Sequence, residues 1–94
     1  MDGSDRNGKE NRVALLAILA QDASAAEEIN RILHDFAPYI IGRMGLPYRE
    51  KNVNIISIVL DAPADKINAL AGSLGRIPGV TAKAVYAEAK KSRN

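Results

Sequence analysis

Two stretches of the chain carry apolar residues at the spacing of an amphipathic helix. The first follows Asp22 and Ser24, which suit a helix N-terminus, and the second follows Pro63, which suits a first helical turn. Their apolar sets, each spaced i, i+3, i+4 and i+7, are Ile29, Ile32, Leu33 and Phe36, then Ile67, Leu70, Ala71 and Leu74. Pro38 ends the first helix, and Gly75 is expected to end the second in a left-handed conformation. The pattern predicts two helices with one apolar face each.

Four further stretches have the composition of β-strands. They are residues 12–20, 39–48, 53–61 and 79–89, and they are rich in Ile, Val, Leu and Ala. The chain order is therefore strand, helix, strand, strand, helix, strand. Right-handed crossovers return both helices to the same side of the sheet. We expect an α+β, ferredoxin-like βαββαβ sandwich, with a four-stranded antiparallel sheet and two helices on one face.

The two ends of the chain differ from the patterned middle. Residues 1–11 are polar, with glycines and mixed charge, and they predict a disordered N-terminal arm. Residues 12–88 form the single ferredoxin-like domain that a chain of 94 residues allows. Residues 89–94 hold two lysines and an arginine, and they predict a basic, solvated C-terminal tail.

The two central strands are apolar on both sides. Val13, Leu15, Ala17 and Leu19 oppose Ala14, Leu16, Ile18 and Ala20 in the first, and Ile56, Ile58 and Leu60 oppose Val53, Ile55 and Val59 in the third. Two helices cover only one face of such a sheet, and the outer face is normally polar. Burying a second apolar face gains roughly 25 cal/mol per Å². We therefore predict a homo-oligomer, a dimer or tetramer, that packs through the open sheet face or extends its sheet across a two-fold axis.

The composition argues against catalysis. The chain has no cysteine and one histidine, His34, which is expected at the rim of the first helix. Nucleophilic triads and thiolate sites lack their residues. Glu27 and Glu28 are explained by a helix N-terminus, where the helix dipole favours negative charge. We predict that the protein is not an enzyme and has no catalytic residue, no metal and no cofactor.

Charge and hydropathy limit the classes of partner that the sequence allows. The formal net charge is +2, from 13 basic and 11 acidic residues, so the chain has no basic stripe for nucleic acid. No apolar run approaches the roughly 20 residues that span a bilayer, and the N-terminus lacks a signal-peptide core. We expect a soluble, cytoplasmic protein without membrane contact, and nucleic acid is disfavoured.

Residues 40–50, IIGRMGLPYRE, interrupt the second strand with two glycines. Gly42 and Gly45 match the Ile-Gly-x-x-Gly loop of KH domains, which clamps a nucleic-acid backbone. A KH loop opens a helix, however, and a strand follows here, so the KH interpretation is disfavoured. Glycine within a strand instead marks a bulge or the approach of another backbone.

A strict period of two assigns the side chains of this segment to two sides. Tyr39, Ile41 and Arg43 share one side, and Ile40, Met44 and Leu46 share the other. If the second set faces the helices, Arg43 projects toward the oligomer side, where its guanidinium needs a partner. We predict a ligand or interface site made of Gly42, Arg43, Met44, Gly45, Pro47 and Tyr48. The alternative is that Arg43 lies on an edge strand with its head in water.

The segments GRMGLPYR (42–49) and LGRIPGV (74–80) carry a family resemblance. Across residues 12–88 the chain resembles a family of small proteins described as proposed regulators of iron-only hydrogenase systems. That family is similar to ACT domains and to the C-terminal sensor domain of nickel-responsive repressors, so the resemblance implies a regulatory, ligand-sensing oligomer. Residues 20–24 lack the glycine of amino-acid-binding ACT domains, and nickel sensors use several His and a Cys, so neither ligand class carries over.

Two functions stay open from the sequence. One is a regulatory module that binds a small molecule or a partner protein and acts on an iron-only hydrogenase system, for instance on its transcription. The other is a structural or nucleic-acid-contacting oligomer that works through its basic tail. The salt dependence of binding to short RNA and DNA distinguishes the two.

Overall fold

The computed structural model describes residues 10–88. In them the chain forms β1 (Asn11–Ala20), α2 (Ala26–Asp35), β2 (Ile40–Tyr48), β3 (Val53–Pro63), α3 (Ala64–Gly75) and β4 (Val80–Tyr86). Three short 3-10 turns, η1 (Ala23–Ala25), η2 (Ala37–Tyr39) and η3 (Arg49–Lys51), lie between them. The predicted arm falls outside the described residues except at its end, where Asn11 already belongs to β1, and the predicted tail at 89–94 lies outside them.

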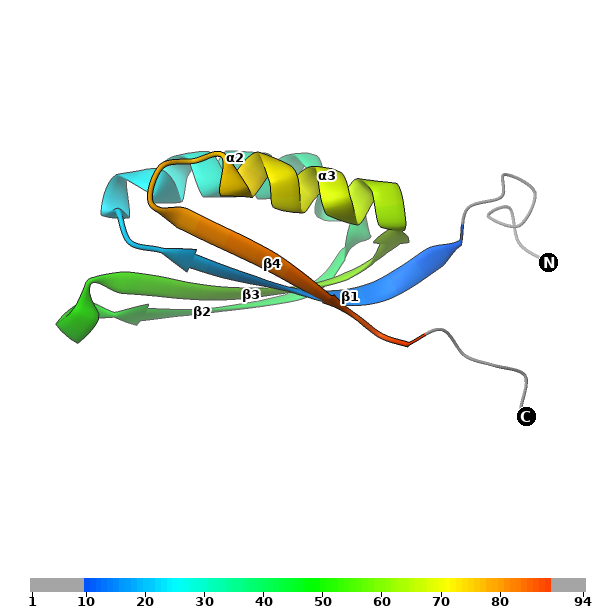
Figure 1. Cartoon of the computed structure of the whole chain (residues 1–94), viewed down its shortest axis with the longest axis horizontal. Helices are drawn as coiled ribbons and strands as arrows, with labels where there is room; N and C mark the ends of the chain where they lie inside the picture. Colours follow the sequence, from blue (N-terminus) through cyan, green and yellow to red (C-terminus); the bar gives the residue numbers. More distant parts are fainter. Residues whose placement is uncertain (1–9, 89–94) are drawn as a thin grey trace.

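The strands form one antiparallel sheet in the order β2-β3-β1-β4. β1 pairs with β3 along its whole length, from Asn11 opposite Pro63 to Ala20 opposite Asn54. Both helices lie on one side of the sheet, and no described segment covers the other side (Figure 1). The molecule is the α+β, ferredoxin-like βαββαβ sandwich that the sequence predicts.

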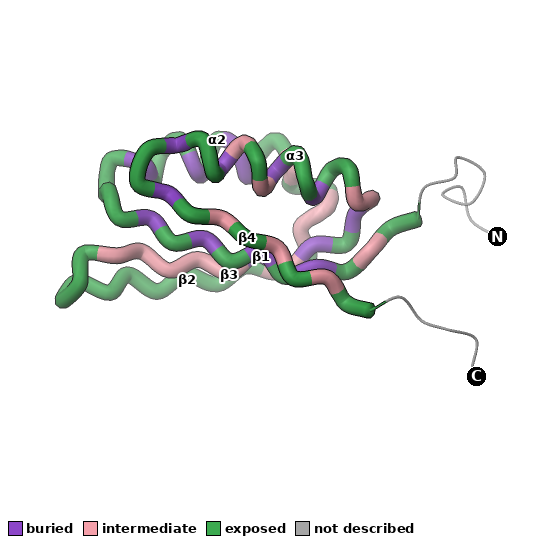
Figure 2. Tube along the Cα trace, viewed as in Figure 1, coloured by how far each residue is buried: buried purple, intermediate pink, exposed green. Residues whose placement is uncertain are grey.

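The core lies between the sheet and the helices (Figure 2). The helices contribute buried side chains at the predicted positions, Ile29, Ile32, Leu33, Ile67, Leu70 and Leu74, and the sheet contributes Leu16, Ile18, Ile58 and Leu60. Among the described residues no polar or charged side chain is buried. Apolar burial is therefore the main interaction that holds the two layers together. No helix in residues 10–88 is both long and apolar enough to cross a membrane.

β1 alternates strictly between the two sides of the sheet. Its buried residues face the helices, and its exposed residues, Val13, Leu15, Ala17 and Leu19, face away. Leu15 lies opposite Val59 of β3, and Leu19 lies opposite Ile55. These cross-strand pairs form the sheet surface opposite the helices, which we call the open face. The predicted two-sided apolar character of the central strands is confirmed.

β2 breaks this alternation with a single bulge. Ile40 pairs with Leu60 of β3, but Gly42 pairs with Val59, so Ile41 is an extra residue in β2. Such a one-residue shift moves every following side chain to the other side of the sheet.

The bulge reverses the predicted orientation of the residues that follow. Arg43 pairs with Ile58, a helix-facing residue, and Met44 pairs with Ser57 on the open face. Leu46, which pairs with Ile55, also lies on the open face. The assignment of Arg43 to the open side and of Met44 and Leu46 to the helix side was therefore wrong, because a strict period of two does not hold across an inserted residue.

The turn from α3 into β4 contains a left-handed glycine, Gly79, with a φ of +80°. A Cβ at this position would come within 3.3 Å of the Cβ of Asp22. Gly75 is instead the last helical residue, and the right-handed Arg76 follows it. The prediction that Gly75 ends the helix in a left-handed conformation was wrong, because the chain reverses four residues later. There the Val80 N–H donates to the carbonyl oxygen of Ile77 at 3.1 Å.

The two glycines make a matched pair of substitutions. Gly79→Ala is expected to lower the free energy of unfolding by about 1–2 kcal/mol, because a side chain disfavours the left-handed region. Gly75→Ala is expected to raise it by up to about 1 kcal/mol, since alanine favours the helix and no heavy atom lies within 4 Å of the added Cβ. Urea unfolding measures both changes. A Gly79→Ala variant as stable as the wild type would contradict the role given to this turn.

Candidate functional site

The six residues of the predicted site are divided between the two sides of β2. Gly42, Met44 and Tyr48 lie on the open face, because their partners are Val59, Ser57 and Val53 of β3. Arg43, Gly45 and Pro47 alternate with them and lie on the helix side. The six residues therefore form two adjacent surfaces that share one strand.

Arg43 reaches the first helix. Its Nη2 donates a hydrogen bond of 3.0 Å to Oδ1 of Asn30 in α2, and both residues are exposed. An exposed hydrogen bond of this kind contributes little net stability. Arg43 thus ties the edge of β2 to α2, which differs from the predicted position at an oligomer interface.

The two glycines of β2 do not serve the fold of the single chain. Neither has a positive φ. A Cβ at Gly42 would make an ordinary contact of 3.9 Å with Val59, and one at Gly45 would meet no heavy atom within 4 Å. Their predicted role, to let a neighbouring chain approach, stays a prediction.

The open face holds most of the large apolar side chains that the described chain leaves exposed. Apart from Ile41 at the bulge, this exposed set is Val13, Leu15, Leu19, Met44, Leu46, Tyr48 and Val85. Their exposed fractions run from 42% at Tyr48 to 68% at Met44. The set comes from β1, β2 and β4, and the half-buried Val53, Ile55 and Val59 of β3 lie between β2 and β1, so the four strands form one continuous apolar surface.

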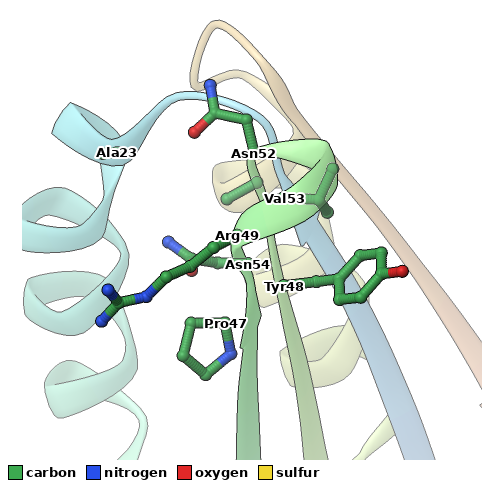
Figure 3. A pocket seen from close by; sticks show the side chains of 8 residues that line it. Ala23, Pro47, Tyr48, Arg49, Asn52, Val53 and Asn54 are labelled. Atoms are coloured by element: carbon green, nitrogen blue, oxygen red, sulfur yellow. The ribbon is translucent and has the colours of Figure 1, made fainter.

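A cavity of about 250 Å³ lies at the end of the β2–β3 hairpin. We call it the hairpin cavity, and its lining includes Ala20 at the end of β1, Ala23 in η1, Pro47, Arg49, Asn52 and Asn54. Figure 3 shows Pro47, Arg49 and Asn54 pointing toward the side of α2, whereas Tyr48 and Val53 point to the opposite side. Tyr48 and Val53 also line the cavity. The cavity and the open face therefore share the end of this hairpin.

Apart from Tyr48, whose hydroxyl donates to Oε1 of Glu50 at 2.9 Å, the polar side chains of the hairpin cavity have no partners within residues 10–88. No hydrogen bond or ion pair joins the Arg49 guanidinium or the carboxamide of Asn54, although Asn54 is half-buried. Asn52 adopts a left-handed conformation with φ 57°, which asparagine tolerates better than most residues. The cavity presents one fixed cation and two carboxamides to an occupant.

The sequence treated Arg49 and Asn52 as parts of a turn and Asn54 as part of a strand, so none of the three was predicted as a site residue. One feature of the sequence could have indicated this site. Asn54 is polar where the other helix-facing residues of the third strand, such as Ile56 and Ile58, are apolar.

A second hollow, of about 360 Å³, lies between the end of α2 and the end of α3. Arg31 and Arg76 line it together with Glu28 and Asp35. Arg31 and Glu28 already form an exposed ion pair at 3.5 Å. Because charges of both signs face this hollow, it has no clear preference for one kind of ligand.

No three His, Asp or Glu side chains of the described chain lie close enough together to hold a metal ion. His34 is exposed in the last turn of α2, as expected of a rim residue. The expected absence of metal, cofactor and catalysis stays a prediction.

The sequence profile of a known family, TM1266-like, described as "Iron-only hydrogenase system regulator, putative", matches residues 12–84. The chain belongs to the TM1266-like family. A solved structure, that of the uncharacterised protein TM1266 from Thermotoga maritima, is similar with a TM-score of 0.80 and 40% sequence identity. That match covers 84% of this chain and 100% of the other. No curated protein matches the chain.

The family match runs from β1 into β4. The TM1266-like region therefore includes both helices, the open face and the hairpin cavity. The family and the fold that the sequence predicts are confirmed, and the family description is that of a regulator.

In this TM1266-like chain, Asp22 caps the turn that leads from β1 into α2. Its Oδ1 accepts hydrogen bonds from the backbone N–H of Ser24 at 3.0 Å and from the Ser24 hydroxyl at 2.9 Å. These bonds, the backbone one first, lower the pKa of the Asp22 carboxyl below its ordinary value of 3.8, against a smaller opposing effect of desolvation. The predicted helix start at Asp22 is confirmed, with η1 as the first turn.

The lowered pKa of Asp22 predicts a pH dependence of stability. The cap contributes fully above the ordinary pKa of 3.8, and its contribution is lost as the pH falls through the lower pKa of the folded state. Asp22→Asn keeps a capping oxygen but cannot titrate, so its unfolding free energy is expected to fall less steeply with acid. Urea unfolding across the acid range measures the two profiles. Parallel profiles for the variant and the wild type would contradict the prediction.

Proposed function

We propose that the chain is a regulatory module, without catalytic activity, that works as a homo-oligomer in which the open faces of two copies pack together. The family description, that of an iron-only hydrogenase system regulator, supports the regulatory part. The apolar open face supports the assembly, and it is the observation on which the proposal mainly rests. A hydrogenase system, and not a substrate of this chain, is then the target of regulation.

The size of the apolar surface favours association. Fully burying one such side chain gains about 1.5–3 kcal/mol. The seven large side chains of the open face are each roughly half exposed, so sealing them gains roughly 5–10 kcal/mol for each protomer. A symmetric pair gains about twice that, against an association cost of about 4–15 kcal/mol. The balance supports a stable dimer.

Packing through the face is favoured over joining the sheet edges. The outer strand β2 carries the bulge at Ile41 and the proline Pro47, which has no N–H to donate. The other outer strand, β4, carries Lys83 and is short. These features protect both edges from pairing with another strand, whereas the open face, apart from Lys83 and Asp61, presents mainly apolar and small side chains.

The shape of the open face suits a second copy. One cross-strand row runs through Lys83, Ala17, Ser57 and Met44, with small residues on the two central strands and long ones on the two outer strands. In the proposed pair, a two-fold axis that runs along the strands and passes between β2 and β3 places Met44 of each copy over Ala17 and Ser57 of the other. Each copy supplies both the projecting and the receiving surface, as a two-fold interface requires.

The charge of the open face disfavours nucleic acid as its partner. Its strand positions include two charged residues, Lys83 and Asp61, which have opposite signs. A surface that binds phosphate backbones needs a clear positive excess. The basic tail of the alternative function lies outside the described residues, so the alternative receives no support from the open face.

Met44→Glu is expected to convert the oligomer into a folded monomer, because it puts a charge into the proposed interface. Arg43→Glu is the matched control, since the neighbouring side chain lies on the helix side and the same new residue should leave the assembly intact. Light scattering after size-exclusion chromatography measures the mass, and circular dichroism confirms folding. A monomeric wild type at micromolar concentration, or equal masses for the two variants, would overturn the assembly.

The regulatory part has its own test. In the cell that encodes this chain, deletion is expected to change the activity or the transcript level of the iron-only hydrogenase system, and the Met44→Glu allele should resemble the deletion. The Arg43→Glu allele should resemble the wild type. Hydrogenase levels that are the same in all four strains would exclude the proposed target.

A further inference from the structure

We propose that the hairpin cavity binds a small carboxylate anion that carries a hydroxyl or amino group near the carboxylate. The proposal rests on the proposed function only in naming this anion as the signal that the regulatory module senses. The position, the charge and the size of the cavity favour such a ligand.

The cavity marks the part of the sheet that the first helix leaves uncovered. Along β1 and β3 the helix-facing residues are apolar except Arg12 and Asn54 at opposite ends. Arg12 is accounted for, because its guanidinium lies 4.7 Å from the centre of the Tyr86 ring and donates to the carbonyl oxygen of Ala87 at 3.1 Å. Asn54 is half-buried without such a partner in the described chain. No buried side-chain N or O atom of the described residues lacks a hydrogen-bond partner, so the Asn54 amide reaches solvent and is open to hydrogen bonds with an occupant of the cavity.

The charge of the lining selects an anion. Arg49 is the one charged residue in the lining, and it points to the same side as Asn54 (Figure 3). A guanidinium stays charged at all relevant pH values and binds a carboxylate through two parallel hydrogen bonds. A single cation matches a monoanion, whereas a phosphate dianion would need a second positive charge, which the lining lacks.

The polar neighbours and the volume define the rest of the ligand. The carboxamides of Asn52 and Asn54 both donate and accept hydrogen bonds, so they can pair with a hydroxyl or amino group. The volume of about 250 Å³ lies below the range of about 300–1,000 Å³ that holds drug-sized ligands. Together these features indicate a metabolite of a few carbon atoms and exclude a nucleotide.

The same hairpin, β2–β3, contributes residues to the hairpin cavity and to the proposed interface. Tyr48 and Val53 line the cavity, yet their side chains point to the open face (Figure 3). An anion bound on one side of this hairpin would thus act on residues that a second copy contacts on the other side. If the two events are coupled, each must change the affinity of the other by the same factor.

Two ligands of nearly equal shape test the site. Lactate is a 2-hydroxy carboxylate, and lactamide is its neutral counterpart. Titration of the full, isotopically labelled chain at constant ionic strength is expected to give saturable NMR shifts of the Asn52 and Asn54 side-chain amides with lactate only. Arg49→Gln should weaken lactate binding at least tenfold, and the control Arg31→Gln, at an exposed arginine of α2, should leave it unchanged.

The variant Asn54→Leu distinguishes a role of Asn54 in ligand binding from a purely structural role. Replacing this amide, which makes no hydrogen bond within residues 10–88, is expected to leave the Tm of the ligand-free protein no lower than that of the wild type, while it weakens lactate binding at least tenfold. A lower Tm would show that the amide serves the fold and would overturn its role in binding.

The remaining outcomes are decisive as well. Equal effects of lactate and lactamide, shifts without saturation, or tighter binding of inorganic phosphate than of lactate would each overturn the proposal. Lactate binding by the Met44→Glu variant separates the cavity from the assembly. If that variant binds lactate and the wild type is a monomer, the cavity stands and the proposed oligomer fails; if the wild type is an oligomer that does not bind lactate, the reverse holds.

Discussion

The central physical constraint on this molecule is that two helices cover one side of a sheet whose middle strands are apolar on both sides. β1 places Leu16 and Ile18 in the core, and the alternate residues Leu15 and Leu19 have the same chemistry but face away from the helices. No polar side chain is buried in the described chain, so the layers adhere mainly by apolar contact, with exposed hydrogen bonds such as that from Arg43 to Asn30 at the periphery. The hydrophobic effect that closes the core also favours burial of the open face, and we propose that a second copy of the chain buries it.

Most of the fold could be predicted because its decisive residues follow simple periods. Ile29, Ile32 and Leu33 repeat at helical spacing, and β1 alternates without interruption, so pattern alone assigned each residue to its side. The prediction of where the helices end was less accurate. Gly75 has the composition of a left-handed helix end, but the left-handed position is Gly79, because the chain needs its reversal where β4 begins.

β2 was predicted as a strand, yet its two sides were exchanged. The cause is one inserted residue, Ile41, because the side chains after an insertion lie on the opposite side from the one that strict alternation predicts. Gly42 beside the bulge was a signal that something interrupts the strand, but it could not tell which residue would be the extra one. Only the register with β3, in which Gly42 meets Val59, fixes the sides of Arg43 and Met44.

The lining of the hairpin cavity overlaps the predicted site only at Pro47 and Tyr48. Arg49 and Asn54, which also line the cavity, were assigned to a turn and a strand. How far a helix extends over a sheet depends on the turn that precedes it, and here Asp22 starts η1 before α2 begins. Whether Asn54 lies beneath that helix or beyond its reach cannot be read from local sequence.

β2 and the start of β3 unite the two surfaces in a way that bears on regulation. The bulge at Ile41 turns Met44 and Tyr48 toward the open face and leaves Arg43 and Pro47 toward α2, so one hairpin contacts both. A hairpin at the sheet edge with two glycines and exposed residues resists deformation less than β1, which is paired on both sides. If a ligand binds on the helix side and changes the contacts of the open face, a small backbone shift costs the least free energy at this edge of the sheet. The bulge that disrupts the sequence pattern is therefore also the feature that decides which residues of β2 face each of the two surfaces.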